Sequence, residues 1–152
     1  MMHVGIPVGV HVLLERDGGI LLMHRAGTGF FDGLFSLPGG HVEPGESLAG
    51  TAVREMREEL GIDIAPAELA NMGVVHRRSD TNRVDFFLRA RAWSGEPHIC
   101  EPAKCDALGW FARGELPANT VAYVREALAA GEGPWLLELG WQAPEKGSEP
   151  GR

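Results

Sequence analysis

A mixed α/β or α+β fold is predicted for this chain, because patterns typical of strands and of helices alternate along it. Its 152 residues are the usual length of one domain, and 44% of them are apolar, which is enough to form a core. Neither a repeat nor a linker interrupts the sequence. We therefore expect a single domain over residues 1–141, followed by a flexible tail over 142–152, where the sequence is polar and contains Pro and Gly.

The first elements predicted are two strands joined by a tight turn. Apolar residues alternate with others over Val8–Leu14, and a second apolar run, Ile20–Met23, follows the turn sequence RDGG. Asp-Gly between two such runs is a typical hairpin signal. Residues 26–34 contain three glycines and indicate a loop, and the sequence FSLPGGHVEPGES after it alternates short apolar pieces with turn residues.

A helix is predicted from Ser47 to Leu60. Ser47 can cap its N-terminus, and Gly61 can end it in a left-handed conformation. The apolar residues of this segment have the spacing of three and four that forms one buried stripe. They are Ala49, Ala52, Val53, Met56 and Leu60.

The second half of the chain is expected to contribute further strands and one more helix. Two strands are predicted at Met72–His76 and Val84–Trp93, and another is expected to end at Trp110 and Phe111. Residues 119–130, which read NTVAYVREALAA, predict a helix. Its inward-facing residues are expected to be Val121, Val124 and Leu128.

The composition argues against several classes of protein. A net charge of −7 disfavours a protein that coats DNA or RNA, because such proteins present basic surface to phosphates. No apolar run approaches the roughly 18 residues that cross a bilayer, and the N-terminus lacks a signal-type segment, so a cytoplasmic location is expected. Cys100 and Cys105 do not make a disulfide framework; we expect two ordinary thiols at a strand edge, with a metal pair or a redox switch as the alternative.

Three carboxylates cluster near the end of the first predicted helix, in the sequence REMREELG. Because a helix turns about 100° per residue, Glu59 lies about 40° to one side of Glu55, and Glu58 lies about 60° to the other. Like charges on one face repel by a few tenths of a kcal/mol per exposed pair, and the helix dipole disfavours anions at this end. The sequence therefore accepts a local cost, which Arg54 can offset in part.

Two interpretations of this acidic face are open. It is either a solvated surface or a site for hard divalent cations such as Mg²⁺ or Mn²⁺, which clustered carboxylates suit. The sequence GGHVEPGE before the helix favours the cation site, because Gly39, Gly40 and Gly45 allow the backbone to approach the same face. Such a loop adds carbonyl oxygens as ligands and amide groups for phosphate.

The segment GHVEPGESLAGTAVREMREELGI, residues 40–62, resembles the Nudix box, and every position of that pattern is matched. The resemblance, to small MutT-like members, extends over residues 5–130. It implies an α/β/α sandwich around a mixed β-sheet, and hydrolysis of a nucleoside diphosphate linked to another group with Mg²⁺ or Mn²⁺. The matching residues are Gly40, Glu46, Arg54, Glu55, Met56, Glu58, Glu59, Gly61 and Ile62.

The resemblance also implies which residues hold the metal. Glu55, Glu58 and Glu59 would bind it, and the carbonyl oxygen of Gly39 would be a further ligand. These are oxygen ligands, which both Mg²⁺ and Mn²⁺ prefer.

The remaining roles implied by the resemblance concern orientation and proton transfer. Arg54 would orient a glutamate through an ion pair. Glu46 would support the loop and the start of the helix, or reach a metal through water. The general base varies within the family, and here Glu58 is the first choice and Glu101 the second.

Candidates for substrate binding lie outside the box. Arg25 follows the second predicted strand, where it would contact phosphate or be an ordinary surface arginine. The stretch EPAKCDALGWF resembles a segment that lies over the substrate in small MutT-like hydrolases, so Glu101 and Lys104 would bind metal or phosphate, or form a loop salt bridge. Asn119 stands where MutT-like enzymes carry an asparagine that reads a purine edge, or it caps the last helix.

Aromatic residues offer stacking or packing. Phe30, Phe31 and Phe35 could stack on a base, although Phe35 could equally fill the core. The tryptophans Trp110, Trp135 and Trp141 are expected in packing or at an interface.

The leading functional hypothesis is a metal-dependent pyrophosphohydrolase that converts a nucleoside triphosphate, or a close analogue, to the monophosphate and pyrophosphate. The alternatives are hydrolysis of a nucleoside diphosphate sugar or another small diphosphate, and a non-catalytic module that senses a nucleotide. The complete glutamate set argues against a pure sensor. The expected partner is a small phosphorylated substrate, with neither nucleic acid nor membrane, and a homodimer, which some relatives form, is left open.

Overall fold

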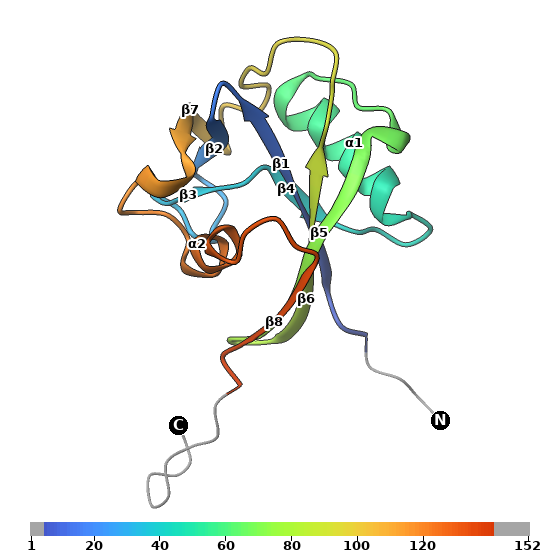
Figure 1. The fold of residues 1–152 in the computed structure, drawn as a ribbon, viewed down its shortest axis with the longest axis vertical. Coiled ribbons are helices and arrows are strands. Elements are labelled where there is room, and N and C mark those ends of the chain that lie inside the picture. Colours follow the sequence, from blue (N-terminus) through green and yellow to red (C-terminus); the bar gives the residue numbers. More distant parts are fainter. Residues whose placement is uncertain (1–4, 142–152) are drawn as a thin grey trace, which may run out of the picture.

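The computed structural model describes residues 5–141 (Figure 1). Within that range the chain forms two α-helices and one sheet of eight strands. The strands are β1 (Val8–Arg16), β2 (Gly19–Arg25), β3 (Phe35–Ser36), β4 (Gly39–His41), β5 (Leu69–Arg78), β6 (Asn82–Ala90), β7 (Cys105–Ala112) and β8 (Trp135–Leu139). The helices are α1 (Leu48–Leu60) and α2 (Ala122–Ala129), and 3₁₀ turns span Pro66–Glu68 and Arg113–Glu115.

Strand β1 pairs along one edge with two antiparallel strands, β4 and β2. Its early residues, from Gly9 to His11, pair with β4, whereas its last residues, Glu15 and Arg16, pair with β2. Its other edge pairs in parallel with β6, and the sheet order is β3-β2-β1-β6-β5-β8, with β7 on β2. Strands β2 and β4 therefore part from each other along β1, and this divergence opens space within the sheet.

One helix covers each face of the sheet (Figure 1). Val12 and Leu14 of β1 belong to a core with Met56 of α1. Leu13, between them, belongs to a second core with Leu128 of α2. Because successive side chains of a strand point to opposite faces, β1 supplies both cores. The predicted α/β/α sandwich around a mixed sheet is confirmed.

The local signals for the first turn and the first helix are confirmed. Asp17 and Gly18 have φ angles of 51° and 80°, as expected for the two central residues of a tight hairpin turn. The side chain of Ser47 accepts a hydrogen bond from the Gly50 N–H at 2.9 Å, and Gly61 ends α1 with a φ of 67°. Both caps satisfy backbone groups that a helix end leaves unpaired.

The last helix begins later than predicted. Its first residue is Ala122, because the preceding backbone pairs with Phe35. The N–H of Phe35 donates to the carbonyl of Asn119 at 2.8 Å, and the N–H of Val121 donates to the carbonyl of Phe35 at 2.9 Å. Val121 is at the N-cap position, so the alternative that Asn119 caps this helix is wrong.

Other boundaries also differ from the predicted ones. Strand β6 ends at Ala90, and Trp93 lies beyond it with its ring 6.5 Å from that of Trp110. The short strands β3 and β4 and the edge strand β8 were not predicted from the sequence. Within β8, the Trp135 ring lies 5.4 Å from that of Phe87, so the packing role expected for Trp135 is confirmed.

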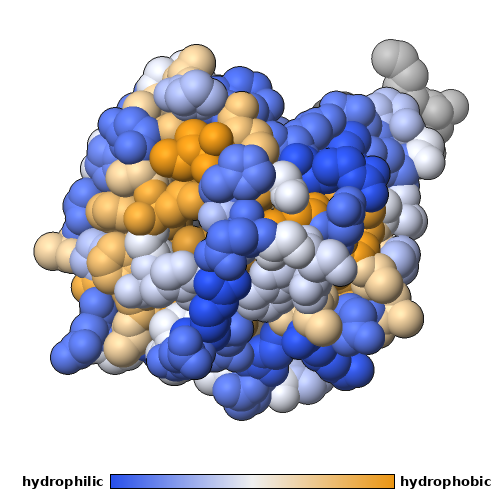
Figure 2. Space-filling view, turned by 90° about the horizontal axis from the view of Figure 1, so that it is seen from above, coloured by the Kyte–Doolittle hydropathy of each residue, from blue (hydrophilic) through white to orange (hydrophobic). Residues whose placement is uncertain are grey.

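The two cysteines are both free thiols, Cys100 exposed and Cys105 buried at the start of β7. No helix in residues 5–141 is long and apolar enough to cross a membrane. Figure 2 looks onto the end of the molecule at the top of Figure 1, where hydrophobic residues gather in patches between hydrophilic ones.

Candidate active site

A cavity of about 570 Å³ lies where β2 and β4 part from each other along β1. Its volume is in the usual range for small-molecule sites, roughly 300–1,000 Å³. The acidic face of α1 forms one wall, and residues of β1, β5, β6 and α2 contribute to the rest. Nine of the predicted site residues line it: Arg25, Gly39, Gly40, Arg54, Glu55, Glu58, Glu59, Glu101 and Lys104.

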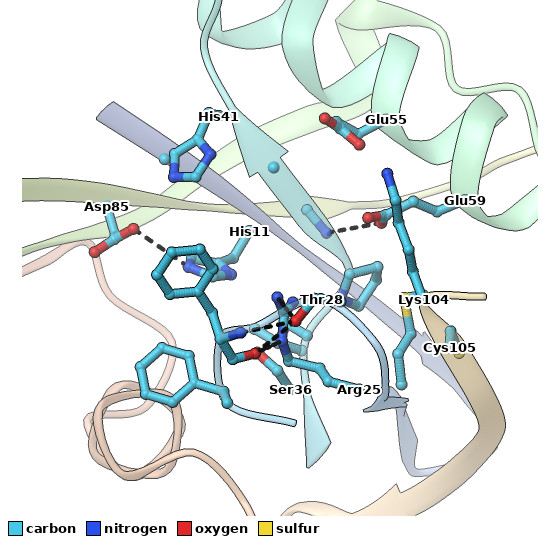
Figure 3. Close-up of a pocket in the computed structure, with 18 of the residues that line it drawn as sticks. His11, Arg25, Thr28, Ser36, His41, Glu55, Glu59, Asp85, Lys104 and Cys105 are labelled. Atoms are coloured by element: carbon cyan, nitrogen blue, oxygen red, sulfur yellow. Dashed lines mark hydrogen bonds and ion pairs between the residues drawn. The ribbon is translucent and has the colours of Figure 1, made fainter. Parts of the chain in front are cut away.

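The glycine-rich strand β4 lies directly against the acidic face of α1. The N–H of Gly39 donates to Oε1 of Glu59 at 3.0 Å, and Figure 3 shows Glu55 and Glu59 both reaching from the helix towards β4. A Cβ atom at Gly40 would stand only 2.1 Å from Oε2 of Glu55. A side chain at position 40 would therefore displace the Glu55 carboxylate, in keeping with the close backbone approach that the sequence predicted for this loop.

Arg54 connects the loop before the helix to the acidic face. Its Nε donates to Oε2 of Glu46 at 2.6 Å, and its Nη1 donates to Glu55 at 3.1 Å and to Glu58 at 3.2 Å. Oε1 of Glu46 also accepts a hydrogen bond from the Thr51 hydroxyl at 2.8 Å. These hydrogen bonds lower the pKa of Glu46 to about 2, and the bond from Arg54 has the largest effect.

The carboxylates on the inner side of α1 are held at an electrostatic cost. Burial raises the pKa of Glu59 to about 8, and the negative charge of Glu55 adds to the effect. Burial likewise raises the pKa of Glu55, against the opposing charge of Arg54. Two desolvated carboxylates side by side are disfavoured as anions unless a positive charge joins them.

This donor set fits a hard divalent cation, which takes oxygen ligands and supplies the missing positive charge. As the side chains stand, no three His, Cys, Asp or Glu residues within 5–141 are grouped to hold a metal ion. Arg54 instead bonds Glu55 and Glu58. A cation would compete with this guanidinium for the same oxygens.

The predicted basic residues lie on the loop side of the cavity. Arg25 donates through Nε to the carbonyl of Phe30 at 2.8 Å and through Nη2 to the Thr28 hydroxyl at 3.2 Å, so it also holds the 26–34 loop. The Lys104 side chain rises beside Glu59 (Figure 3). Glu101 lines the same cavity, and its carbonyl accepts the Lys104 N–H at 2.9 Å in a turn.

The other predicted residues lie outside the lining. Asn119 donates through Nδ2 to the carbonyl of Gly33 at 3.0 Å and so fixes the 26–34 loop. Glu46 accepts a hydrogen bond from Thr51 near the start of α1, and Gly61 ends the helix. Phe30 and Phe31 line the cavity, whereas Phe35 packs in the core against Phe111 at 5.3 Å between ring centroids.

A cluster of polar residues that the sequence did not single out forms the wall opposite α1. It consists of His11 on β1, Arg77 on β5, Arg83 and Asp85 on β6, and Tyr123 on α2. We call it the sheet-side cluster. Its sequence signal is Asp85, a charged residue between the apolar residues Val84 and Phe86. Pairing of distant strands brings His11, Arg77, Arg83 and Asp85 together, and α2 adds Tyr123.

Comparison with known proteins places this fold and site in one family. The family model described as NUDIX domain matches residues 5–131. A solved structure, the MutT NUDIX hydrolase from Burkholderia pseudomallei, superimposes with a TM-score of 0.76 at 35% identity, covering 83% of this chain and 98% of that one. The architecture and the acidic helix therefore define a Nudix-type domain. The chain belongs to the Nudix family.

Two curated relatives cover different shares of the chain. A CTP pyrophosphohydrolase of Escherichia coli is 39% identical over 84 residues, which are 55% of this chain and 58% of the relative. An NAD-capped RNA hydrolase of Stutzerimonas stutzeri is 33% identical over 130 residues, 84% of this chain and 42% of the relative. In both cases the match spans less than two thirds of the relative's length.

Proposed function

We propose that this chain is a metal-dependent hydrolase that cleaves a phosphoanhydride bond in a nucleoside triphosphate or a related nucleoside diphosphate derivative. The observation that carries the proposal is the pair Glu55 and Glu59, two desolvated carboxylates that face the glycine-rich β4 in one cavity. Arg25 and Lys104 line the same cavity and supply positive charge for phosphate oxygens. The similar protein of Escherichia coli is a CTP pyrophosphohydrolase, which supports the same substrate class.

The residues that would hold the cation are Glu55, Glu58, Glu59 and the carbonyl oxygen of Gly39. Mg²⁺ or Mn²⁺ bound there would neutralise phosphate charge and make bound water more acidic. The backbone of Gly39 is already fixed against Glu59 by the hydrogen bond from its N–H. The proposed ligands are thus held on two elements that contact each other.

Glu58 is the proposed general base, with Glu101 as the second candidate. The Glu58 side chain is 50% exposed, and its Oε1 is occupied by Arg54. Within residues 5–141 its Oε2 has no hydrogen-bond partner, and this oxygen would take the proton of the attacking water. Arg54 orients this carboxylate, and its own position is fixed by Glu46. The products expected from a nucleoside triphosphate are the nucleoside monophosphate and pyrophosphate.

Product analysis tests this proposal. The purified chain is incubated with nucleoside triphosphates and nucleoside diphosphate sugars, with Mg²⁺, with Mn²⁺ or with a chelator. We expect metal-dependent release of pyrophosphate from at least one triphosphate, and its loss in Glu58→Gln. Glu126→Gln, an exposed glutamate on α2 away from the cavity, is the matched control and should keep wild-type turnover.

Two other results would change the assignment. Faster cleavage of a nucleoside diphosphate sugar than of any triphosphate would move the substrate to that class. Nucleotide binding without turnover under every metal condition would contradict hydrolysis and favour a nucleotide-sensing module.

A further inference from the structure

The sheet-side cluster lies across the cavity from the carboxylates of α1. Residues of both walls line the same space of about 570 Å³. If the phosphates of the substrate lie against α1, as the proposed function requires, the rest of the nucleotide extends towards this cluster. Figure 3 shows His11 and Asp85 on the side of the cavity away from Glu55 and Glu59.

Asp85 organises the cluster. Its side chain is 1% exposed, and its Oδ2 accepts a hydrogen bond from Nε of Arg77 at 2.7 Å. Its Oδ1 lies 3.4 Å from Nε2 of His11 and 3.6 Å from Nη2 of Arg83. A Cβ atom at Gly9 would stand 2.5 Å from that same Oδ1, so the small residue in β1 makes room for the carboxylate.

The cluster carries more positive than negative charge. Two guanidinium groups, those of Arg77 and Arg83, face the single carboxylate of Asp85. Within residues 5–141, the two terminal nitrogens of Arg77 have no hydrogen-bond partner. Its Cζ lies 3.9 Å from the ring centroid of Tyr123, which fixes the plane of the guanidinium. A ligand group with acceptor atoms would use these free donors.

Aromatic rings stand at the same end of the cavity. Phe30 and Phe31 are 68% and 43% exposed, and the Phe31 ring lies 6.1 Å from that of Tyr123. Phe31 has a φ of 55°, which is unusual for a bulky residue. The loop around it is held by Asp32, whose carboxylate accepts the N–H groups of Thr28 and Gly29. A planar ring fits between such aromatics better than a second phosphate.

We infer that the sheet-side cluster binds the nucleobase, and that Arg77 selects bases that present two adjacent hydrogen-bond acceptors. Guanine does so with O6 and N7, and cytosine does so with O2 and N3. Adenine places an amino donor beside its acceptors, and uracil places an N–H between its two oxygens. The two parallel N–H donors of a guanidinium suit two adjacent acceptors better than they suit any other arrangement. The inference rests on the proposal that the substrate is a nucleotide.

Binding of nucleoside monophosphates tests base selection without relying on hydrolysis. Calorimetry of the wild-type chain with GMP, CMP, AMP and UMP should show tighter binding of GMP, CMP or both, by about 5-fold to 150-fold over AMP and UMP. Arg77→Lys keeps a cation beside Asp85 but loses the fork, so the preference should shrink towards 1-fold. Arg78→Ala, an exposed neighbour on the same strand, is the matched control and should keep the wild-type preference.

These measurements show whether guanine or cytosine is the preferred base. They also test base selection separately from hydrolysis. Preference for GMP alone, for CMP alone or for both identifies the base and supports the inference. Equal or undetectable binding of all four, tighter binding of AMP or UMP, or a preference that survives Arg77→Lys overturns it. A base preference in a chain that hydrolyses no triphosphate would leave this inference standing while the proposed function fails, and hydrolysis without any preference would do the reverse.

Discussion

Nε of Arg54 lies 2.6 Å from Oε2 of Glu46, and Nη1 of the same guanidinium bonds both Glu55 and Glu58. One side chain thus ties the loop that precedes α1 to two of the three carboxylates that are proposed metal ligands. Since a planar fork can serve several carboxylates at fixed angles, the position of each carboxylate depends on this arginine. The positive charge of Arg54 also reduces the repulsion between the like charges of Glu55 and Glu58 on α1.

Arg54→Lys should weaken the site although it keeps the charge. An ammonium group cannot bond Glu46 and the helix carboxylates with the same geometry, so Glu58 should lose its orientation. Loss of a residue that orients metal ligands typically reduces metal affinity or activity by about 10-fold to 100-fold. Mn²⁺ titration by calorimetry, together with kcat and KM, measures this. Wild-type values for both would show that the fork is unnecessary.

Gly40→Ala should disable the site because it adds a methyl group where Glu55 lies. The added Cβ would stand 2.1 Å from Oε2 of Glu55, so the carboxylate must move. Displacement of a group in the catalytic arrangement by about 1 Å can reduce the rate about 100-fold. The matched control is Gly114→Ala, because a Cβ there meets nothing within 4 Å. Equal kcat in the two variants would contradict the proposed role of Glu55.

Glu58→Gln and Glu101→Gln separate the two candidates for the general base. A positioned base contributes roughly 100-fold to 10,000-fold to the rate. We expect a kcat loss of that size for Glu58→Gln and a smaller one for Glu101→Gln, with the fold of both retained by circular dichroism. If Glu101→Gln reduces kcat more than Glu58→Gln does, the assignment of Glu58 as the general base is wrong.

Acid should remove the stabilisation that Asp85 provides. Burial alone would raise the pKa of Asp85, but His11 and Arg77 outweigh it and lower the pKa from 3.8 to about 2. The unfolded chain therefore takes up this proton first as the pH falls, so the contribution is complete above about pH 4 and is lost between pH 4 and 2.

Urea unfolding of the wild type and of Asp85→Asn measures that contribution. Removing one partner of a buried ion pair costs roughly 3–5 kcal/mol. The gap in unfolding free energy between the two proteins should be of this order at pH 6 and should narrow as the pH falls to 2. A gap that stays constant over this range would show that the ionised form of Asp85 is not what stabilises the fold.

The acidic wall of the site could be predicted because its residues are neighbours in the sequence. Helical periodicity places Glu55, Glu58 and Glu59 on one face, and the local caps Ser47 and Gly61 fix where that helix begins and ends. Such signals depend only on residues a few positions apart.

The opposite wall could not be predicted, because it is assembled by pairing between distant strands. His11 and Asp85 meet through the parallel pairing of β1 with β6, in which His11 stands opposite Phe87, and Arg77 joins them through β5. The late start of α2 has a similar cause, since the backbone before it pairs with Phe35, far away in the sequence. Nothing in the local pattern of residues 119–121 encodes that partner.

The central claim is that carboxylates of α1 hold a hard cation that is required for phosphoanhydride hydrolysis. The most direct test measures pyrophosphate release from a nucleoside triphosphate against Mg²⁺ concentration, in the wild type and in Glu59→Gln. We predict no release in chelator, saturable activation by Mg²⁺ in the wild type, and a large loss of that activation in Glu59→Gln. Release that is independent of divalent cations, or equal activation of the two proteins, would contradict it.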